Sequence, residues 1–539
     1  MKSPAGFRGA FRSDELACAV YSEAAGVARI IPAAVAVPLD ADDIVTLVRW
    51  AAAERVALTA RGSGSSMANG AVGPGCIVDL GRLQRLDPVG VRDRRVVVGA
   101  GVIRDQLQQV TLRDALQFPV EPSSCGFATI GGMCATHAAG ARHVRYGPLR
   151  RWVAGLECVF ADGTRAWIRR GERASGIAAL DRFERDVAPR VRSSAPELLR
   201  HAAVRKESSG YALADWRESG DVVDLLIGSE GTLALIVAAD LRLTPLAPAT
   251  ASLLAAFPDL EGAAAAAIHL AAAGASAVEM LDRSFLAVAA LEGAPVPLPA
   301  GVEAVLLVEA ESEDEVLVRS RIKELAGWCE AGGALRVDVA MGPGEEAILW
   351  RLRHAASPIL SRLAPRLQSL QLAEDGCVPP ARFAEYVRGA RAALTRSRLE
   401  GVIFGHAGDA HAHVNALVDT SVPDWRARCE TLIDEVTALV VRLGGTLAGE
   451  HGDGRLRAPL LARTWPASTV ALFEATKRAF DPDGILNPGV KIAAPGATPL
   501  ADIKYDPALP PLPSAARAAL DLVVRDKAWG RSRLDLLQK

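Results

Sequence analysis

The stretch Arg61-Gly-Ser-Gly-Ser-Ser-Met-Ala-Asn-Gly70 carries three glycines and almost no bulky side chains. A short apolar run, Val56–Thr59, precedes it and predicts a buried strand that ends where the loop begins. Glycines in such a loop let backbone N–H groups approach phosphate oxygens, because no Cβ stands in the way. Taken alone the loop is weak evidence, since a stretch of this kind is more often a simple tight turn.

Two further small-residue stretches follow in the same part of the chain, at Glu121–Gly140 and at Gly228–Thr232. Three such loops together could line an extended diphosphate ligand. A Rossmann site is disfavoured, because Gly99-Ala-Gly101-Val-Ile-Arg104 has arginine where the third glycine of the G-x-G-x-x-G fingerprint belongs. The sequence also lacks G-x-x-x-x-G-K-[ST], which excludes a P-loop.

The composition and the hydrophobic pattern of the sequence change after Pro245–Pro248. Beyond this point alanine-rich helical stretches alternate with strand candidates, which predicts a second, α+β domain. We therefore expect a first domain over residues 14–246, a second over 247–495, and a proline-rich linker with a terminal helix over 496–539. This modestly basic helix is expected to be solvated, although contact with a membrane surface or a redox partner stays open.

Four of the nine histidines fall in two short motifs of the second domain, Phe404–Asn415 and Gly449–Asp453. His406 and His413 are seven residues apart, so a straight strand would point them to opposite faces. The intervening Gly-Asp turn could bring both imidazoles to one centre. With Glu450 they would offer two nitrogens and a carboxylate, a set that suits a catalytic Zn²⁺ or Mn²⁺. No H-E-x-x-H motif is present, which disfavours a zincin peptidase.

The three loops, together with Lys206-Glu-Ser-Ser-Gly-Tyr211, resemble in order and spacing the FAD-binding domain of vanillyl-alcohol-oxidase-type flavoproteins over residues 14–245. The resemblance implies an α+β fold that begins with a two-subdomain PCMH-type FAD-binding domain. It also implies non-covalent FAD, because Ser65 stands near the place where some members attach the flavin through a histidine. The FAD contacts implied by the resemblance are Arg61, Gly62, Ser63, Gly64, Ser65, Ser66, Asn69, Gly70, Pro122, Ser123, Thr129, Gly131, Gly132, Thr136, Ala138, Gly140, Glu230, Gly231 and Asn487.

The two histidine motifs resemble those of the FAD-linked D-2-hydroxyacid dehydrogenases, the group that oxidises D-lactate, D-2-hydroxyglutarate and glycolate. In that family the motifs read G-H-x-G-D-G-N-x-H-x-N and x-E-H-G. The resemblance implies that the second domain is an α+β cap of the FAD-linked oxidase C-terminal type and holds a divalent metal, Zn or Mn. The site residues that it implies are the metal ligands His406, His413 and Glu450, the general base His451, and the substrate-binding Asn415, Arg353 and Ser357.

This sequence departs from the family pattern at two places. Ala410 and His411 stand where the family has Gly-Asn, so His411 is either an extra ligand or the partner of a ligand. Where some relatives place a lysine, this chain has Glu374 and Asp375, as do larger relatives that carry an additional iron–sulfur domain.

The resemblance implies oxidation of a D-2-hydroxy acid to the 2-oxo acid, by metal-assisted deprotonation of the hydroxyl and hydride transfer to flavin N5. Electrons would pass to an acceptor other than NAD: a quinone, a cytochrome, an electron-transfer flavoprotein or an iron–sulfur subunit. Three alternatives stay open. They are a flavoenzyme of the same superfamily acting on an aldonolactone or an alkyldihydroxyacetone-phosphate type of substrate, a subunit of a multi-component glycolate oxidase, and a metal-dependent hydrolase without flavin.

Composition restricts the partners of the chain. Of its 539 residues, 50% are apolar and 23% are charged, and the net charge of −2 gives no overall attraction to nucleic acid. No C-x-x-C pair occurs among the eight cysteines, which fits a reducing compartment. The alanine-rich run Gly262–Leu281 carries His269 and Glu279, so we expect a helix of a soluble domain rather than a membrane span. We expect no secretory signal and a homodimer in the cytoplasm, or peripheral to the inner membrane face.

Overall fold

The computed structural model describes residues 1–291, 296–354 and 366–537. The first subdomain is built on a small sheet with the order β1-β2-β4-β3, in which the last three strands are parallel. Helix α2 lies in the crossover between β2 and β3, and the Asp40 side chain caps it by accepting from the N–H groups of Asp42 and Asp43. The elements of this subdomain are β1 (Ala10–Arg12), α1 (Glu15–Val20), β2 (Ala34–Val37), α2 (Ala41–Glu54), β3 (Leu58–Arg61) and β4 (Cys76–Asp79).

The second subdomain is an antiparallel sheet with the order β5-β9-β7-β8, and short helices pack around it. Its strands are β5 (Arg95–Gly99), β7 (Val153–Val159), β8 (Arg165–Arg169) and β9 (Leu235–Arg242), and a short pair joins β6 (Leu116–Gln117) to β10 (Thr244–Pro245). Its helices are α3 (Arg104–Thr111), α4 (Ile130–Thr136), α5 (His143–Tyr146), α6 (Ala178–Asp186), α7 (Ala188–Ser193), α8 (Leu213–Ser219) and α9 (Val222–Leu226).

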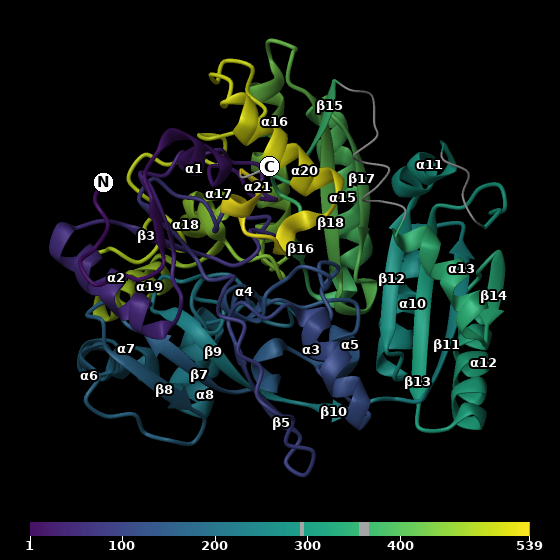
Figure 1. Ribbon diagram of the computed structural model, residues 1–539. Coiled ribbons are helices and arrows are strands. Elements are labelled where there is room, and N and C mark those ends of the chain that lie inside the picture. The colour runs from purple at the N-terminus through teal and green to yellow at the C-terminus, as the bar shows by residue number, and fades with distance from the viewer. Residues whose placement is uncertain (292–295, 355–365, 538–539) are drawn as a thin grey trace.

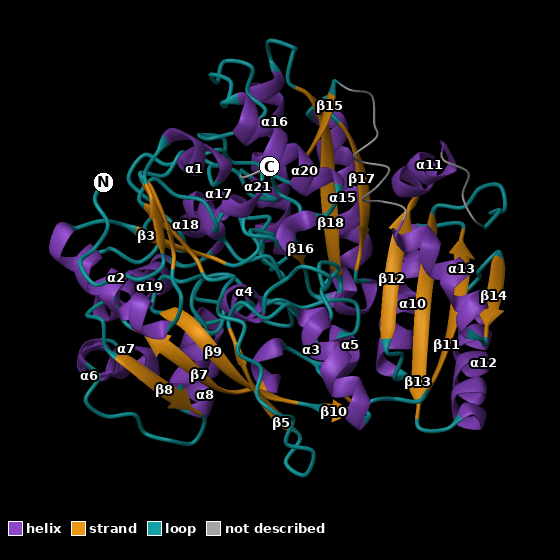
Figure 2. Ribbon diagram, viewed as in Figure 1, coloured by secondary structure: helices purple, strands orange, loops and turns teal. Residues whose placement is uncertain are grey.

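The cap is an eight-stranded antiparallel sheet with the order β14-β11-β13-β12-β17-β18-β15, and β16 pairs beside this path with β18. Figure 2 shows these strands in orange, with helices packed against the sheet. The strands are β11 (Ala249–Phe257), β12 (Ala277–Asp282), β13 (Ala304–Ser312), β14 (Arg336–Ala340), β15 (Leu367–Leu370), β16 (Gly376–Cys377), β17 (Glu400–Gly405) and β18 (His411–Asp419).

Helices α10 (Leu260–Ala272), α12 (Glu315–Ala331), α15 (Phe383–Arg396) and α16 (Trp425–Arg442) share one apolar core with one face of this sheet. Helices α11 (Arg283–Leu291) and α13 (Pro343–His354) pack on part of the opposite face. Along β18, Ala412, Val414 and Ala416 belong to the core under the first set of helices. Because side chains alternate along a strand, His411, His413 and Asn415 point to the other face.

The run Gly262–Leu281 is not one helix. Its first half lies in α10, as expected, but its second half forms β12, so the prediction of a helix over the whole run is wrong. Gly274 separates the two elements with a φ of +88°, a conformation that glycine adopts without strain. Glu279 thereby lies on a central strand and is fully buried.

The end of the chain returns to the FAD-binding subdomains. Helix α19 (Ala467–Phe480) packs against α6, and residues 481–513 contain no helix or strand. Helices α20 (Ser514–Arg525) and α21 (Arg533–Leu536) pack on α1, near the C-terminus marked in Figure 1. The expected solvated terminal helix is therefore wrong, because one face of α20 is buried. None of the described helices is long and apolar enough to span a membrane.

Candidate active site

The hairpin β17–β18 brings the first histidine motif together. His406 follows β17 directly, a short 3-10 turn at Ala407–Asp409 reverses the chain, and β18 begins at His411. Ala410 completes the turn in the left-handed region, with a φ of +54°. The ring centroids of His406 and His413 consequently lie 5.5 Å apart, although the two residues would point to opposite faces of a straight strand.

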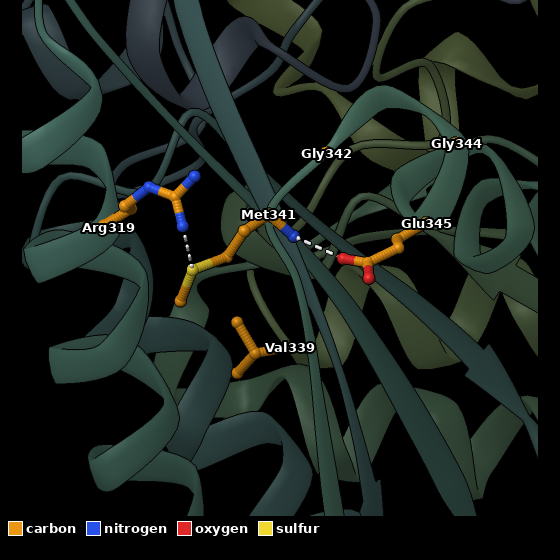
Figure 3. Close-up of a pocket in the computed structure, with 6 residues that line it drawn as sticks. All are labelled: Arg319, Val339, Met341, Gly342, Gly344 and Glu345. Atoms are coloured by element: carbon orange, nitrogen blue, oxygen red, sulfur yellow. Dashed lines mark hydrogen bonds between the residues drawn. The ribbon is translucent and has the colours of Figure 1, made fainter.

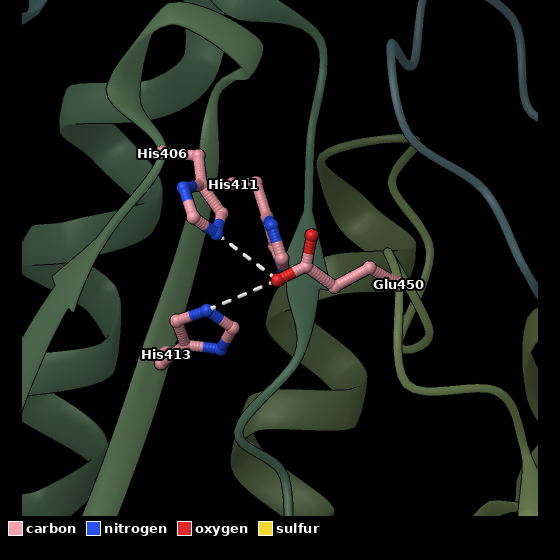
Figure 4. Close-up of side chains that lie close together, drawn as sticks. All are labelled: His406, His411, His413 and Glu450. Atoms are coloured by element: carbon pink, nitrogen blue, oxygen red, sulfur yellow. Dashed lines mark hydrogen bonds and ion pairs between the residues drawn. The ribbon is translucent and has the colours of Figure 1, made fainter. Parts of the chain in front are cut away.

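Glu450 joins these histidines from the loop that follows α16 (Figure 4). Its Oε1 lies 3.0 Å from His406 Nε2 and 3.6 Å from His413 Nε2. One ligand atom from each of His406, His411, His413 and Glu450 lies within 4.8 Å of the others, and all four residues are buried. We refer to these four residues as the cap cluster.

The protonation states of two members of the cap cluster, Glu450 and His411, fit a cation, whereas in His406 the charge of Glu279 outweighs burial and raises the pKa. Burial opposes the charged form of Glu450, but Lys206 and His406 outweigh it and hold the pKa of this carboxyl well below its usual range. Burial lowers the pKa of His411 to about 4, so its imidazole is neutral at neutral pH. A carboxylate and neutral imidazoles are the ligand forms that divalent metals bind.

Each histidine of the cap cluster has one ring nitrogen held by a carboxylate. His406 Nδ1 contacts Glu279, His411 Nε2 lies 2.8 Å from Asp375 Oδ1, and His413 Nδ1 lies 3.2 Å from Glu374 Oε2. In the first and third histidines the other nitrogen faces Glu450, and His411 Nδ1 is buried with no hydrogen-bond partner in the described structure. Metal-ligating histidines are oriented in this way by outer carboxylates, so the residues present fit a metal site.

A second compact group consists of Glu374, Asp375, His413 and His451. Its two carboxylates already have donors, because Arg457 Nη2 donates to Glu374 Oε1 at 2.5 Å and the His451 N–H donates to Asp375 Oδ2 at 2.9 Å. Glu374, Asp375 and His451 of this group therefore form an outer layer around His413, and the cap cluster is the better candidate for a cation site.

His451, the expected general base, lies at the border of the two groups and is 27% exposed through its side chain. Its Nδ1 lies 2.9 Å from Glu374 Oε1, and its Nε2 lies 4.0 Å from Glu450 Oε1. Burial disfavours the imidazolium, but the charges of Glu374 and Asp375 outweigh it and raise the pKa of His451 to about 10. A cation bound at Glu450 would oppose this protonation by repulsion.

Two of the three expected substrate-binding residues, Arg353 and Asn415, lie on different segments of the cap domain. Arg353, on α13, donates from Nε to Glu279 Oε2 at 2.7 Å, and its guanidinium lies 4.8 Å from the ring centroid of Phe404. Glu279 therefore joins Arg353 to His406 directly. Asn415 lies on the same face of β18 as His413. Ser357 falls outside the described residues.

The glycine-rich loops meet at the other side of the site. A Cβ on Gly62 would lie 2.1 Å from Thr129 Oγ1, so only glycine lets the first loop approach the second so closely. In the described part of the chain, the backbone N–H groups of Ser63–Ser66 donate to no protein acceptor, and Ser66 Oγ is buried without a partner. A row of unused N–H groups is an anion-binding arrangement, so this loop fits the diphosphate of FAD.

Other expected FAD residues hold the loops together. Asn487 Nδ2 donates to the carbonyls of Gly70 and Glu230, which ties the first loop to the third. Glu230 accepts from the backbone N–H groups of Asp453 and Gly454, at the end of the second histidine motif. The remaining positions lie in the same loops: Gly64, Ser65 and Asn69 in the first, Pro122, Ser123, Gly131, Gly132, Thr136, Ala138 and Gly140 in the second, and Gly231 in the third.

Lys206 connects the two halves of the site. Its buried Nζ donates to the carbonyl of Gly140, in the second FAD loop, and to Glu450 Oε2 at 2.9 Å. Glu450 Oε1 faces the histidines of the cap, so one lysine and one carboxylate span the distance from a flavin loop to the cap cluster. The second glycine-rich loop and the cap cluster, which lie in the two separate domains expected from the sequence, are therefore adjacent.

A surface hollow on the cap lies apart from this site (Figure 3). It is lined by residues of α12, β14 and the start of α13: Arg319, Val339, Met341, Gly342, Gly344 and Glu345. No residue of the cap cluster or of the glycine-rich loops contributes to it. We assign it no part in the chemistry.

Comparison with known families agrees with this arrangement. Residues 32–169 match a family model described as FAD binding domain, and residues 246–490 match one described as FAD linked oxidases, C-terminal domain. The chain therefore carries, in this order, a FAD-binding domain and a C-terminal domain of the FAD-linked oxidases. The expected fold class and the FAD cofactor are thus confirmed.

Three curated relatives are each 29% identical to this chain. Glycolate oxidase subunit GlcD of Bacillus subtilis (strain 168) aligns over 86% of this chain and 89% of its own length. D-lactate dehydrogenase of Archaeoglobus fulgidus aligns over 84% and 89%, and D-2-hydroxyglutarate dehydrogenase of Xanthomonas citri pv. viticola over 85% and 89%. Among solved structures, 4-ethylphenol oxidase from Gulosibacter chungangensis has a TM-score of 0.64 at 17% identity, covering 90% of this chain and 94% of that chain, which supports the fold.

The sequence alone predicts no role for the residues that orient the cluster, Glu279, Glu374, Asp375 and Arg457. Glu279 left one signal, because it is the single acid in the apolar run Gly262–Leu281. Burying a carboxylate is costly unless it is paired, so a lone acid in such a run indicates a specific partner. Which partner it meets depends on the pairing of β12 with β17, which the sequence does not reveal.

Proposed function

We propose that this chain oxidises a D-2-hydroxy acid of the D-lactate or D-2-hydroxyglutarate type to the 2-oxo acid and passes the electrons to an acceptor other than NAD. The observation that carries the proposal is the direct link, through Lys206, between Glu450 of the cap cluster and Gly140 of a flavin loop. The names of the D-lactate and D-2-hydroxyglutarate dehydrogenase relatives support a reaction at a CH–OH group.

In this proposal His406, His413 and Glu450 bind a divalent metal, Zn or Mn, and His411 Nδ1 is a fourth candidate ligand. The cation, when bound, would polarise the oxygens of the substrate as a Lewis acid. Support comes from the carboxylates that hold the outer nitrogen of every histidine in the cluster.

His451 is the proposed general base. Its Nδ1 is held by Glu374, which leaves Nε2, on the side of Glu450, to take the hydroxyl proton of the substrate. Arg353, Asn415 and Ser357 are proposed to hold the substrate, with the planar guanidinium of Arg353 gripping a carboxylate. FAD, when bound non-covalently along the glycine-rich loops, would accept the hydride at N5.

The partners follow from the same proposal. The acceptor would be a quinone, a cytochrome, an electron-transfer flavoprotein or an iron–sulfur subunit. We propose a homodimer that works in the cytoplasm or at the inner face of a membrane. The low net charge gives no reason to expect nucleic acid as a partner.

The test is anaerobic bleaching of the bound flavin by a panel of D- and L-2-hydroxy acids, with and without a chelator. We expect D-lactate or D-2-hydroxyglutarate to bleach the visible absorption band of the oxidised flavin, the L-enantiomers to leave this band unchanged, and the chelator to slow the reaction. A flavin that no 2-hydroxy acid reduces would refute the proposal.

A second candidate is a glycolate oxidase subunit, which the relationship to the subunit GlcD favours. Glycolate belongs in the same panel for this reason. Bleaching by glycolate but by neither D-lactate nor D-2-hydroxyglutarate would favour this candidate over the first.

A further inference from the structure

The end of the chain covers the back of the first glycine-rich loop. Residues 514–537, which include α20 and α21, pack on α1 through an apolar face that includes Leu520 and Val523. Arg533 Nη2 then donates to the carbonyl of Ser63 at 2.9 Å, across 470 residues of sequence. We call residues 514–537 the C-terminal strap.

Arg533 is only 2% exposed, and among the described residues its hydrogen-bond partners are all backbone carbonyls, while its guanidinium also lies 5.5 Å from the ring centroid of Trp529. Its Nη1 donates to the carbonyls of Ala528, Trp529 and Arg531, and its Nε is buried without a partner. Burial and the nearby charge of Arg61 lower the pKa of Arg533 to about 9. The guanidinium is therefore a buried cation with no carboxylate in contact, although the charge of Asp79 lies near enough to favour its charged form.

Arg61, at the start of the loop, is likewise a buried arginine whose guanidinium donates to backbone carbonyls. It is 2% exposed, and its guanidinium donates to the carbonyls of Tyr21 and Glu23. Within the described residues, no carboxylate lies within 4.0 Å of the guanidinium nitrogens of Arg61 or Arg533, and the nearby charge of Asp79 only partly offsets the cost of burying them. Two buried cations beside one loop, with no carboxylate in contact, are expensive unless an anion joins them.

The loop has backbone N–H donors for which the described residues supply no acceptor. The Ser63 carbonyl is engaged by Arg533, whereas the N–H groups of Ser63–Ser66 have no protein acceptor in the described part of the chain. A diphosphate would supply both the acceptors that these N–H groups lack and the negative charge that the two guanidiniums lack.

We propose that the C-terminal strap holds the loop Arg61–Gly70 in its diphosphate-binding shape, and that Arg533 is the positioning residue through which the strap acts. Arg533 fixes the Ser63 carbonyl and adds positive charge behind the loop, so it strengthens the binding of the ADP half of FAD without touching the flavin ring. The inference goes beyond the proposed oxidation and does not depend on the identity of the substrate.

The experiment measures binding to the deflavinated full chain and its Arg533→Gln variant. The probes are FAD, riboflavin, which has no diphosphate, and ADP as a competitor of FAD. We expect Arg533→Gln to lower the affinity for FAD and the affinity for ADP by about tenfold each, which is the effect of losing one charge-assisted interaction. The affinity for riboflavin should stay unchanged. Raising the ionic strength should weaken FAD binding more in the wild type than in the variant.

Arg525→Gln is the matched control, because Arg525 is an exposed arginine of the same strap that contacts only Asp526. Unchanged FAD affinity in Arg533→Gln would overturn the proposal. Equal weakening of FAD and riboflavin, with a lower unfolding temperature of the apoprotein, would also overturn it, because it would show a merely structural role.

Arg533→Lys provides a second variant if Arg533→Gln does not fold. Lysine keeps the charge but cannot engage several carbonyls with a planar fork, so FAD affinity should fall in part and riboflavin affinity should not. An Arg533→Lys variant with the FAD affinity of the wild type would contradict the role assigned to the guanidinium.

Discussion

Lys206 donates to Glu450 Oε2 at 2.9 Å, and both side chains are buried. The lysine belongs to the FAD-binding part and the glutamate to the cap. This ion pair therefore holds the two domains together between the second glycine-rich loop and the cap cluster. The favourable pairing also keeps Glu450 ionised, as a metal ligand must be.

Replacing Lys206 by methionine should therefore destabilise the protein strongly. In the protein without a bound metal, the substitution leaves the buried Glu450 carboxylate without its lysine partner, and removing one partner of a buried ion pair typically costs about 3–5 kcal/mol. We expect a lower urea midpoint for the FAD-loaded protein stripped of metal, measured by flavin fluorescence and circular dichroism together. Lys323→Met, on the exposed side of α12, is the control; a Lys206→Met protein as stable as that control would show that the pair contributes little.

The cap cluster predicts a metal content that can be counted. Glu450→Gln removes a carboxylate ligand while keeping the shape of the side chain, so the metal per bound FAD, measured by mass spectrometry of the elements, should fall to near zero. FAD content should stay close to that of the wild type. His269→Gln, which lies on α10 against Trp328, should retain the metal. A wild-type protein purified without any divalent metal, and unable to bind one, would refute the site.

His411 offers a test of the fourth ligand. Its Nδ1 is buried without a partner, and its Nε2 is held by Asp375, so the ring is oriented as a ligand would be. We expect His411→Asn, which restores the residue of the related motif, to lower metal affinity by about 10- to 100-fold. Titration of the apoprotein with Zn²⁺ and Mn²⁺ would measure it. Equal affinities in both proteins would place His411 outside the ligand set.

Arg353 should control substrate binding more than turnover. Arg353→Lys keeps a positive charge but loses the planar fork, so the KM for the 2-hydroxy acid should rise about tenfold with a smaller change in kcat. Arg351→Lys is a close control, because Arg351 is an exposed arginine of the same helix. Equal KM values in Arg353→Lys and in Arg351→Lys would contradict a role of Arg353 in substrate binding.

Much of this arrangement could be predicted from the sequence, because some residue types are required by local geometry. Gly62 had to be glycine for the first loop to meet Thr129, and the spacing of His406 and His413 required a turn between them. These constraints act over a few residues, where a sequence pattern is readable.

Other parts depend on contacts between distant segments and could not be predicted. The amphipathic pattern of α20 indicates a buried face, but it does not tell which surface covers it, and here it is α1. The alanine-rich run beyond Gly274 fits a helix as well as a strand, and only its pairing with β13 decides for the strand. Glu374 and Asp375 acquire their role because β16 pairs with β18 and places them beside His413 and His411.

His201, which is not a member of the cap cluster, predicts how the stability of the protein changes with pH. Its Nδ1 contacts Glu207 and its Nε2 lies 3.0 Å from the carbonyl of Thr464. Burial lowers its pKa, but the charge of Glu207 outweighs this effect and raises the pKa of His201 above the usual value of 6.5. The folded protein therefore binds this proton more tightly than the unfolded chain does, and the stabilisation is full below pH 6.5 and is lost as the pH rises through the raised pKa.

His201→Gln should destabilise the protein by about 1.5 kcal/mol at pH 6, the usual scale of one charge-assisted hydrogen bond, and by less at pH 9. Urea midpoints of the two proteins, measured at several pH values with His269→Gln as the control, would test this; a difference that grows with pH would contradict the assigned direction.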